Sequence, residues 1–385
     1  SYSRRKVSQS TMKFSYLWLK ELVGFKQSPH ALAELLTLRS FEVESVEKAG
    51  SDYSLDVKVS ANRLTDAAGH RGLAREIAAI TNSAYKEPNI KAPAGTKKFF
   101  IDIRIVPSNL CSRYTGVMLE ISKNGAGPRW MQERLIACGL RPINAIVDVT
   151  NYVMLETGHP LHAFDADKIA GKEMLIRESK KGEEIITLDE VKRILPDGVI
   201  VIQDRDRIID LAGIMGGKNS AITEGTKTVF LQAAVFDPVL IYRGSTLTGL
   251  QSPASKIYAA GADISASFAV VERATELLEE KEIANARRIG SAYDWYPEKA
   301  VPVQIIFRPD YADSIIGQGE GSAFYQRTFA RLGFSVKKRE KDLIVEIPIC
   351  RRDIRIEEDL IEEAARMFGY ENITPRFPTA ALVPG

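Results

Sequence analysis

The sequence predicts an α+β protein of several domains. Its 385 residues exceed one small module and suggest about two or three domains. Stretches with the period-two alternation of strands lie between stretches with helical periodicity, and segments containing Pro and Gly separate them. The 45% apolar and 26% charged residues are typical of a globular chain and exclude a disordered, collagenous or disulfide-dense one.

Charge and cysteine content exclude further classes. The 52 basic and 50 acidic residues give a net charge of +2, so no global field attracts the chain to DNA or anionic lipid. Cys111, Cys138 and Cys350 show no CxxC spacing, which disfavours a disulfide framework or structural zinc and fits the reducing cytoplasm. No apolar run approaches the roughly 18 residues that span a bilayer, so we expect a cytoplasmic protein without a membrane partner.

The first unit is expected at residues 13–95. Residues 1–12 lack the apolar stretch of a signal peptide, so we expect a leader or a cloning remnant there, with organelle targeting as the alternative. Ser28 followed by Pro29 is typical of a helix start. Further predicted elements are a strand at 55–60, a helix through Leu73, Ile77 and Ile80, and a linker at 91–96.

Residues 98–290 are expected to form one larger α+β domain. Its predicted strands combine β-branched residues with alternation, and its first long helix lies between a proline and a glycine. The strands are expected at 100–106, 199–202 and 228–234, the helices at 128–139 and 265–280, and residues 293–297 interrupt the pattern.

Residues 301–372 are predicted to form a small winged-helix-like module, and residues 373–385 a linker or tail. Its last helix begins with Glu357, Glu358 and Asp359. This is the wrong charge for a helix that reads a DNA groove, so no DNA partner is expected. The elements are a strand at 303–307, a helix at 322–332, a strand at 343–349 and a helix at 356–368.

Polar side chains that could carry chemistry gather in residues 141–165. Thr150, Asn151 and His162, expected near a strand end, supply a hydroxyl, an amide and an imidazole that could hold a polar ligand and a water molecule. Taken alone, the segment favours a plainer interpretation, in which these groups satisfy buried backbone. His159, His162 and Asp165 also suggest a metal site, but two histidines separated by a proline are not a helical ligand pair.

A second candidate segment contains Gly213, Gly216 and Gly217. Glycines let a ligand approach bare backbone N–H groups, and a tight structural turn explains them equally well. The spacing matches neither GxGxxG nor a P-loop, so nothing here indicates ATP binding.

Six ordered motifs run along nearly the whole chain. They are MKFSYLWLKELV at 12–23, SFEVESVE at 40–47, ANRLTDAAGHRGLARE at 61–76, GLRPINAIVDVTNYVMLETGHPLHAFD at 139–165, LAGIMGG at 211–217 and IPICRRDIRIEEDLIEEAARMFGY at 347–370. As a set they resemble the β subunit of bacterial phenylalanyl-tRNA synthetase.

The resemblance implies a domain plan and a site. A central α+β editing-like domain of the B3/B4 type is expected between two small modules of winged-helix-like type, the second of them of the B5 type. No metal is expected in the site. Carried over by position, the catalytic residues are Thr150, Asn151 and His162, and the substrate-binding residues are Gly213, Gly216, Gln232, Ser252 and Ala254.

The resemblance also implies a function. The chain is expected to be a β-subunit portion of a phenylalanine–tRNA ligase that supports phenylalanyl-tRNA aminoacylation and hydrolyses mischarged Tyr-tRNA(Phe). Its expected partners are tRNA(Phe) and the α subunit. No cofactor is expected in this chain, because ATP and Mg²⁺ belong to the synthetic site of the complete enzyme. The alternative is a non-catalytic remnant that binds tRNA or a partner protein through a degenerate pocket.

Three departures from the family pattern favour this alternative or limit the function. Gln232 stands where the family usually has Glu, which removes a charge-assisted hydrogen bond about twice as strong as a neutral one. Residues 256–263 lack the usual run of charged residues. Residues 40–50 lead almost directly into 51–63, where the usual member inserts an OB-like tRNA-binding domain, and Leu64 replaces a proline.

Overall fold

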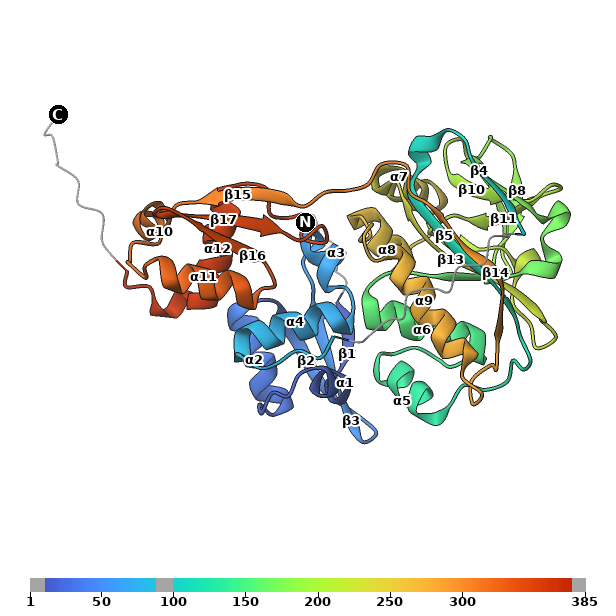
Figure 1. Cartoon of the computed structure of the whole chain (residues 1–385). Helices are drawn as coiled ribbons and strands as arrows, with labels where there is room; N and C mark the ends of the chain where they lie inside the picture. The colour runs from blue at the N-terminus through green and yellow to red at the C-terminus, as the bar shows by residue number, and fades with distance from the viewer. Residues whose placement is uncertain (1–10, 88–99, 376–385) are drawn as a thin grey trace, which may run out of the picture.

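The computed structural model describes residues 11–87 and 100–375. The first ten residues of the predicted leader, the predicted linker at 91–96 and most of the predicted tail lie outside the described residues. The chain forms three α+β units, which follow one another from blue through green to red in Figure 1. The predicted mixed α+β class is confirmed.

The first unit is a three-stranded antiparallel sheet with helices packed around it. Its second helix begins as predicted, because the Ser28 side chain accepts a hydrogen bond from the N–H of Ala31 at 3.3 Å and Pro29 is the first helical residue. The strand order is β1–β3–β2. The elements are β1 (Met12–Ser15), α1 (Tyr16–Leu22), α2 (Pro29–Arg39), β2 (Glu42–Ala49), β3 (Asp52–Lys58), α3 (Leu64–Ala67) and α4 (His70–Thr81).

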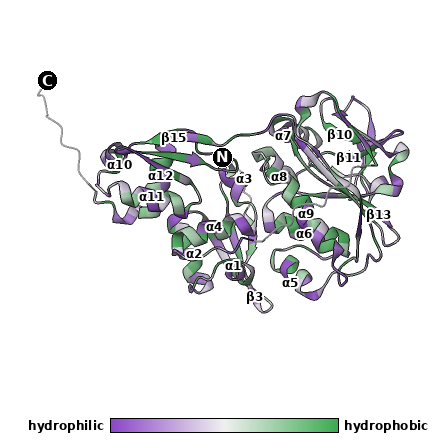
Figure 2. Ribbon diagram, viewed as in Figure 1, coloured by the Kyte–Doolittle hydropathy of each residue, from purple (hydrophilic) through white to green (hydrophobic). Residues whose placement is uncertain are grey.

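The predicted strand and helix of this unit are confirmed as β3 and α4, although β3 begins three residues before the alternation at 55. β2 and β3 are joined by a two-residue turn, Gly50 and Ser51, at the point where the family pattern has its insert. α4 buries Leu73 and Ile77. In Figure 2, α4 shows hydrophobic and hydrophilic residues in turn along its ribbon, as expected of a helix with one buried face.

The central unit contains a four-stranded and a five-stranded sheet that share a hydrophobic core, and a two-stranded sheet, β8–β9. Its elements are β4 (Asp102–Ile105), β5 (Cys111–Glu120), α5 (Arg129–Ala137), α6 (Ala145–Thr157), β6 (His162–Asp165), β7 (Glu173–Glu178), β8 (Glu184–Ile186), β9 (Lys192–Ile194), β10 (Ile200–Gln203), β11 (Ile208–Leu211), β12 (Met215–Gly216), β13 (Thr228–Phe236), α7 (Pro238–Thr248), α8 (Pro253–Ala260), α9 (Ser267–Glu279) and β14 (Arg287–Trp295).

The four-stranded sheet, β14–β5–β13–β6, separates two cores. Alternate residues of β13 point to opposite faces. Leu231 and Ala233 pack in the core that includes α6 and α9, whereas Phe230 and Ala234 pack in a core shared with the five-stranded sheet β12–β11–β10–β7–β4. Gln232 therefore lies on the face that looks toward the five-stranded sheet.

Two expectations for this unit are wrong. Thr150 and Asn151 lie within helix α6 rather than near a strand end; the helix begins after Asn144, whose side chain accepts from the N–H of Val147 at 3.1 Å. Residues 293–297 do not simply interrupt the pattern, because β14 continues through Trp295 and pairs with β5. A single edge strand with intermediate burial carries little periodic signal, which is why the sequence did not reveal it.

The third unit follows the predicted order of its main elements. Both predicted helices and both predicted strands are present, and one further helix and one further strand were not predicted. The strand order is β15–β17–β16. The elements are β15 (Val303–Phe307), α10 (Pro309–Ile316), α11 (Ser322–Arg331), β16 (Ser335–Arg339), β17 (Asp342–Ile347) and α12 (Glu357–Phe368).

Seven charged side chains, here called the buried ion cluster, join the first and third units. Glu76 of α4 is at its centre, with one carboxylate oxygen 2.5 Å from an Arg63 nitrogen and the other 2.8 Å from an Arg366 nitrogen. Arg366 also bonds Glu363 at 2.6 Å. Figure 1 shows the two units side by side. The cluster comprises Arg63, Asp66, Glu76, Arg351, Asp353, Glu363 and Arg366.

The first and central units meet through bare backbone. A Cβ atom on Gly69 would lie 2.2 Å from the backbone nitrogen of Gly158, so the two glycines allow the close approach of α4 and the end of α6. Within residues 11–87 and 100–375, no helix has both the length and the apolar character needed to cross a membrane.

Candidate functional site

A cavity of about 290 Å³ lies between the four-stranded and five-stranded sheets of the central unit. Seven of the eight predicted site residues line it, although they are spread over more than 100 sequence positions. They come from α6, β6, the β11–β12 hairpin, β13 and the start of α8. These seven are Asn151, His162, Gly213, Gly216, Gln232, Ser252 and Ala254.

The eighth predicted residue, Thr150, is not among the residues that line the cavity. Its hydroxyl donates to the carbonyl of Val147 at 2.8 Å, one turn back along α6. Neighbouring residues on a helix point in directions about 100° apart, so Asn151 and Thr150 do not face the same space. The prediction that Thr150 shares the cavity is therefore wrong.

His162 and Gly216 are positioned together. A Cβ atom on Gly216 would lie 2.6 Å from Cε1 of the His162 ring, so only the bare backbone leaves room for the imidazole. His162 stands opposite Gln232 in the ladder of β6 and β13. Burial lowers the pKa of His162 to about 4, so the ring is neutral near pH 7.

Gln232 has an internal phenol as its partner. The Tyr114 hydroxyl, on neighbouring strand β5, donates to Oε1 of Gln232 at 2.6 Å. The alternation of residues 228–234 predicts that Gln232 shares a strand face with Phe230 and Ala234 and points either into a pocket or at a buried backbone partner. It lines the cavity, but its bonded partner is a side chain rather than backbone. Its best acceptor position is thus already used within the protein.

The β11–β12 turn and the start of α8 are tied together. Gly213 has a φ of +69°, which disfavours other residues, and a Cβ there would lie 2.9 Å from Tyr258. The Ser252 hydroxyl donates to the carbonyl of Ile214 at 2.9 Å and accepts from the N–H of Ser255 at 3.0 Å. Gly213 and Ser252 therefore shape the cavity wall, so both the binding and the structural interpretations of the glycine segment have support.

Asn151 presents an uncommitted amide to the cavity. It is half-buried on α6, and its side chain makes no hydrogen bond with another described residue. The amide can both donate and accept. Asn151 and His162 together offer polar groups suited to holding a water molecule.

Asp210 was missed by the sequence analysis. Its carboxyl lies on β11, is 3% exposed and lines the same cavity. Burial raises the pKa of Asp210 well above the usual aspartate value, with no other cause, and among described residues the carboxyl has no hydrogen bond or ion pair. A signal was present in the sequence: Asp210 is the single charged residue within the apolar run from Ile208 to Ile214.

Asp210→Asn is expected to stabilise the fold at pH 8. A carboxyl whose pKa is raised by folding favours the folded state below its ordinary value, about 3.9, and loses that advantage as the pH rises through the folded value. The isosteric amide does not ionise, so its burial brings no such loss of stability as the pH rises. Thermal unfolding of the variant should occur a few degrees above wild type at pH 8, with the difference closing near pH 3.9. Asp206→Asn, at an exposed turn position, is the matched control; equal midpoints for Asp210→Asn and wild type at pH 8 would contradict the buried, unpaired carboxyl.

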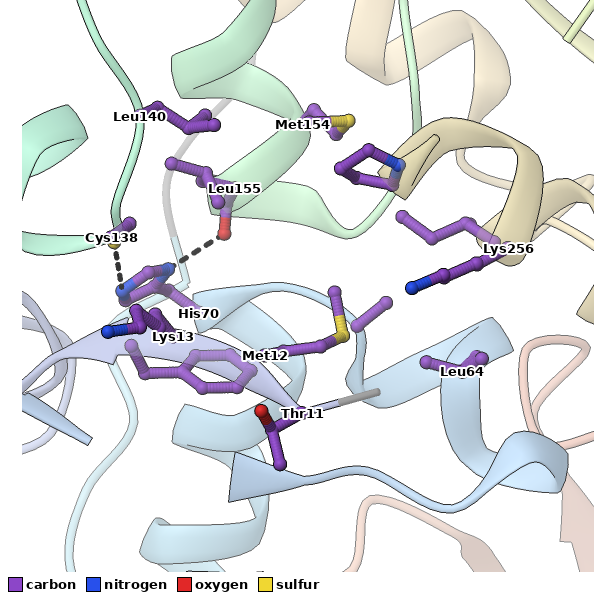
Figure 3. A pocket seen from close by; sticks show the side chains of 14 residues that line it. Thr11, Met12, Lys13, Leu64, His70, Cys138, Leu140, Met154, Leu155 and Lys256 are labelled. Atoms are coloured by element: carbon purple, nitrogen blue, oxygen red, sulfur yellow. Dashed lines mark hydrogen bonds between the residues drawn. The ribbon is translucent and has the colours of Figure 1, made fainter. Parts of the chain in front are cut away.

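A second, mainly apolar cavity of about 190 Å³ lies between the first and central units (Figure 3). The Nδ1–H of His70 donates to the carbonyl of Leu155 at 2.8 Å, because its Nε2 accepts from the N–H of Ser15 at 2.9 Å. Burial lowers the pKa of His70 to about 3, against the opposing effect of the Leu155 bond. His70 is thus a satisfied interface residue. The two cavities share Leu140, Met154 and Pro253 in their linings.

The possible metal residues are occupied otherwise. Nδ1 of His159 bonds the carbonyl of Pro160 at 3.0 Å, and Asp165 accepts from Thr226 at 2.8 Å and lies 3.2 Å from Lys168. Across the part of the chain that the structure describes, no three His, Cys, Asp or Glu side chains are grouped to hold a metal ion.

Comparison with known proteins matches two domains in this chain. Residues 110–282 match the B3/4 domain, and residues 305–370 match the tRNA synthetase B5 domain. The fold and the site therefore define a protein of the class that joins a B3/4 domain to a tRNA synthetase B5 domain.

Individual relatives show which proteins of this class the chain is similar to. The phenylalanine–tRNA ligase β subunit of Carboxydothermus hydrogenoformans is 37% identical over 344 residues, covering 89% of this chain and 43% of that protein. The β subunit of Gloeobacter violaceus is 39% identical, covering 86% of this chain and 42% of that protein. Over most of its length the chain is similar to phenylalanine–tRNA ligase β subunits, and it spans about two fifths of the length of these relatives.

A solved structure shares the fold. The crystal structure of an N-terminal fragment of the phenylalanyl-tRNA synthetase β subunit from Pyrococcus horikoshii matches with a TM-score of 0.53 and 12% identity. The match covers 93% of this chain and 99% of that fragment. At this identity the likeness shows the arrangement of elements and nothing of the site.

Proposed function

We propose that the cavity of the central unit hydrolyses the ester that joins tyrosine to tRNA(Phe). The observation that carries this proposal is the convergence of seven predicted residues on one cavity. At about 290 Å³ the cavity is at the small end of ligand sites, which suits one amino-acid side chain rather than a whole nucleotide. The B3/4 match spans the same part of the chain.

A separate hydrolytic site is needed because synthesis alone discriminates poorly. A hydrophobic pocket shaped for one side chain rejects an isostere that adds a hydroxyl by only about 100-fold. A second site that bonds the hydroxyl reverses this preference, because phenylalanine leaves its buried polar group unpaired.

The proposed chemistry uses a positioned water molecule. Water adds to the ester carbonyl carbon, the bond from that carbon to the ribose oxygen breaks, and the ribose oxygen takes the proton as tyrosine leaves. The half-buried Asn151 and His162 lie where the carbonyl of an inserted tyrosyl group would remain. Because His162 is neutral and weakly basic, its role is to hold and orient the water by hydrogen bonding.

Within a complete enzyme the chain would act as part of the β subunit. There we propose that it supports phenylalanyl-tRNA formation together with the α subunit and that tRNA(Phe) is the shared ligand, in the cytoplasm. ATP and Mg²⁺ are proposed to act at the synthetic site of that enzyme, outside these residues.

The chain is expected to hydrolyse Tyr-tRNA(Phe) faster than Phe-tRNA(Phe). The two deacylation rates are measured as the loss of acid-precipitable labelled amino acid and are compared with the uncatalysed rate. His162→Ala is expected to lower the tyrosyl rate by about 100-fold, because misplacing a reacting group by about 1 Å can cost that much. His30→Ala, at an exposed position of α2, should leave it unchanged.

The competing function is that of a non-catalytic binding module. The bond from Tyr114 to Gln232 favours it, because an internal phenol already occupies the acceptor at the position where the family usually has Glu. Gln232→Glu separates the two functions, since a restored charge should raise the tyrosyl rate in a hydrolase. If wild type and Gln232→Glu both stay at the uncatalysed rate while folded, the binding module replaces the hydrolase.

The contribution of His162 is expected to be constant near neutral pH. Burial lowers its pKa to about 4, so the ring stays neutral from about pH 5.5 to 8 and becomes protonated only below. The ratio of wild-type to His162→Ala deacylation rates should therefore be flat across this range and fall toward pH 4. A step in this ratio near pH 6.5, the ordinary histidine value, would show that His162 is exposed to water in the active state.

A further inference from the structure

The cavity has a deep end and an outer end. Asp210 is 3% exposed on the five-stranded sheet, whereas Asn151 and His162 are half-buried. A tRNA end is far larger than the cavity, so an aminoacyl group must enter side chain first. Its ester then stays beside Asn151 and His162, and the tip of its side chain reaches toward Asp210.

Three other polar side chains around the inner cavity already have hydrogen-bond partners within the protein. Oε1 of Gln232 accepts from Tyr114 at 2.6 Å. Tyr258 donates to the carbonyl of Pro160 at 3.1 Å. The hydroxyl of Ser252 both donates and accepts within the protein.

We propose that Asp210 accepts the hydrogen bond of the tyrosine phenol and is the specificity-determining residue of this cavity. The proposal rests on the proposed function for its substrate class. A phenol O–H at the deep end gives the carboxylate the partner that residues 11–87 and 100–375 do not provide. Phenylalanine in the same position excludes water from Asp210 and supplies no donor, so its binding leaves a buried acceptor unpaired.

The ionisation of Asp210 gives the proposal a distinctive signature. Burial raises its pKa, so the carboxylate that binds the phenol most strongly forms only as the pH rises. The facing titratable groups are His162, with a pKa of about 4, and Tyr114 and Tyr258, whose pKa values are raised mainly by burial. Preference for tyrosine should therefore increase with pH through the titration of Asp210.

The test measures binding separately from hydrolysis. The probes are two non-hydrolysable amides, 3′-tyrosylamino-3′-deoxyadenosine and its phenylalanyl counterpart, titrated calorimetrically into the full chain. Wild type should bind the tyrosyl probe at least about tenfold more tightly at pH 8, with the ratio decreasing at lower pH. Asp210→Asn should reduce the ratio of tyrosyl to phenylalanyl affinity and remove its pH dependence. Asp210→Leu should abolish the preference for the tyrosyl probe.

Controls keep the result interpretable. Asp206→Asn, in the exposed turn before β11, should leave the ratio unchanged, and retained phenylalanyl binding shows that each variant is folded. If Asp210→Asn and Asp210→Leu both keep the wild-type ratio and pH dependence, or if wild type shows no preference, the proposal is overturned. Preference without hydrolysis of Tyr-tRNA(Phe) would instead reject the hydrolase and leave Asp210 as the phenol acceptor.

Discussion

Replacing Glu76 with glutamine is expected to lower the free energy of unfolding by about 3–5 kcal/mol, out of the roughly 5–15 kcal/mol of a typical native protein. Glu76 is 4% exposed and bonded to both Arg63 and Arg366. Glutamine preserves the shape but removes the charge, so two buried guanidinium groups each lose one of their counter-ions. Urea unfolding at pH 7 measures the loss.

An exposed ion pair provides the control for this change. Glu133 lies 2.8 Å from Arg129 on α5, with both side chains more than half exposed. Glu133→Gln should therefore cost about 0–1 kcal/mol. Comparable losses for Glu76→Gln and Glu133→Gln would show that the buried ion cluster does not stabilise the contact between the first and third units.

Acid should reveal the same cluster. Burial by itself raises the pKa of Glu76 and Glu363, but Arg366 and the other cluster arginines outweigh it, so the pKa of Glu76 is held well below its ordinary value and that of Glu363 at about 2. Such carboxylates stabilise the fold above their ordinary values and lose that contribution as the pH falls toward the folded values. Stability should decline below about pH 4.3, and less steeply in Glu76→Gln.

Gly216→Ala is expected to lower Tyr-tRNA(Phe) deacylation by about 100-fold with little loss of stability. The added methyl group would lie 2.6 Å from Cε1 of His162, so the ring must move, and a displacement of about 1 Å in a catalytic site can cost about 100-fold. β12 has only two residues, so the sheet core remains. Single-turnover deacylation and thermal unfolding measure the two effects.

Gly225→Ala is the matched control for steric displacement. A Cβ atom there has no neighbour closer than 4.0 Å, so neither deacylation nor unfolding should change. If Gly216→Ala retains the wild-type rate, the position of the His162 ring does not control the reaction, and its assigned role in holding water is wrong.

Helices and strands with a local signal could be predicted from the sequence. The start of α2 is fixed by Ser28 and Pro29, and β13 by the alternation around Gln232, so neighbouring residues carry the information. β14 and β16 could not be predicted in this way, because their extended conformation depends on pairing with β5 and β17. Thr150 was misplaced because Thr and β-branched neighbours gave no clear helical period over α6.

Site residues within long sequence motifs could be predicted. Contacts that depend on the pairing of distant strands could not. Seven cavity residues followed from the family resemblance. The bond between Tyr114 and Gln232 joins residues 118 positions apart, and only the register of β5 and β13 brings them together. Asp210 was missed because a lone acid in an apolar run does not reveal whether it faces solvent or a cavity.

The buried ion cluster was also invisible, although all seven of its residues lie within the quoted motifs 61–76 and 347–370. Charges on a helix normally indicate a solvated face, and Arg366 was consistent with simple stabilisation of the end of α12. Only the packing of α4 against the third unit removes Glu76, Glu363 and Arg366 from water.

The same cluster sets an order for folding during synthesis. Glu76 and Arg366 are 290 positions apart, and a ribosome adding about 5–20 residues per second needs roughly 15–60 s to cover that distance. Throughout this interval the newly made first unit holds Glu76 and Arg63 without Arg366. The first unit is therefore completed only when α12 packs against α4, after the intervening residues have been made.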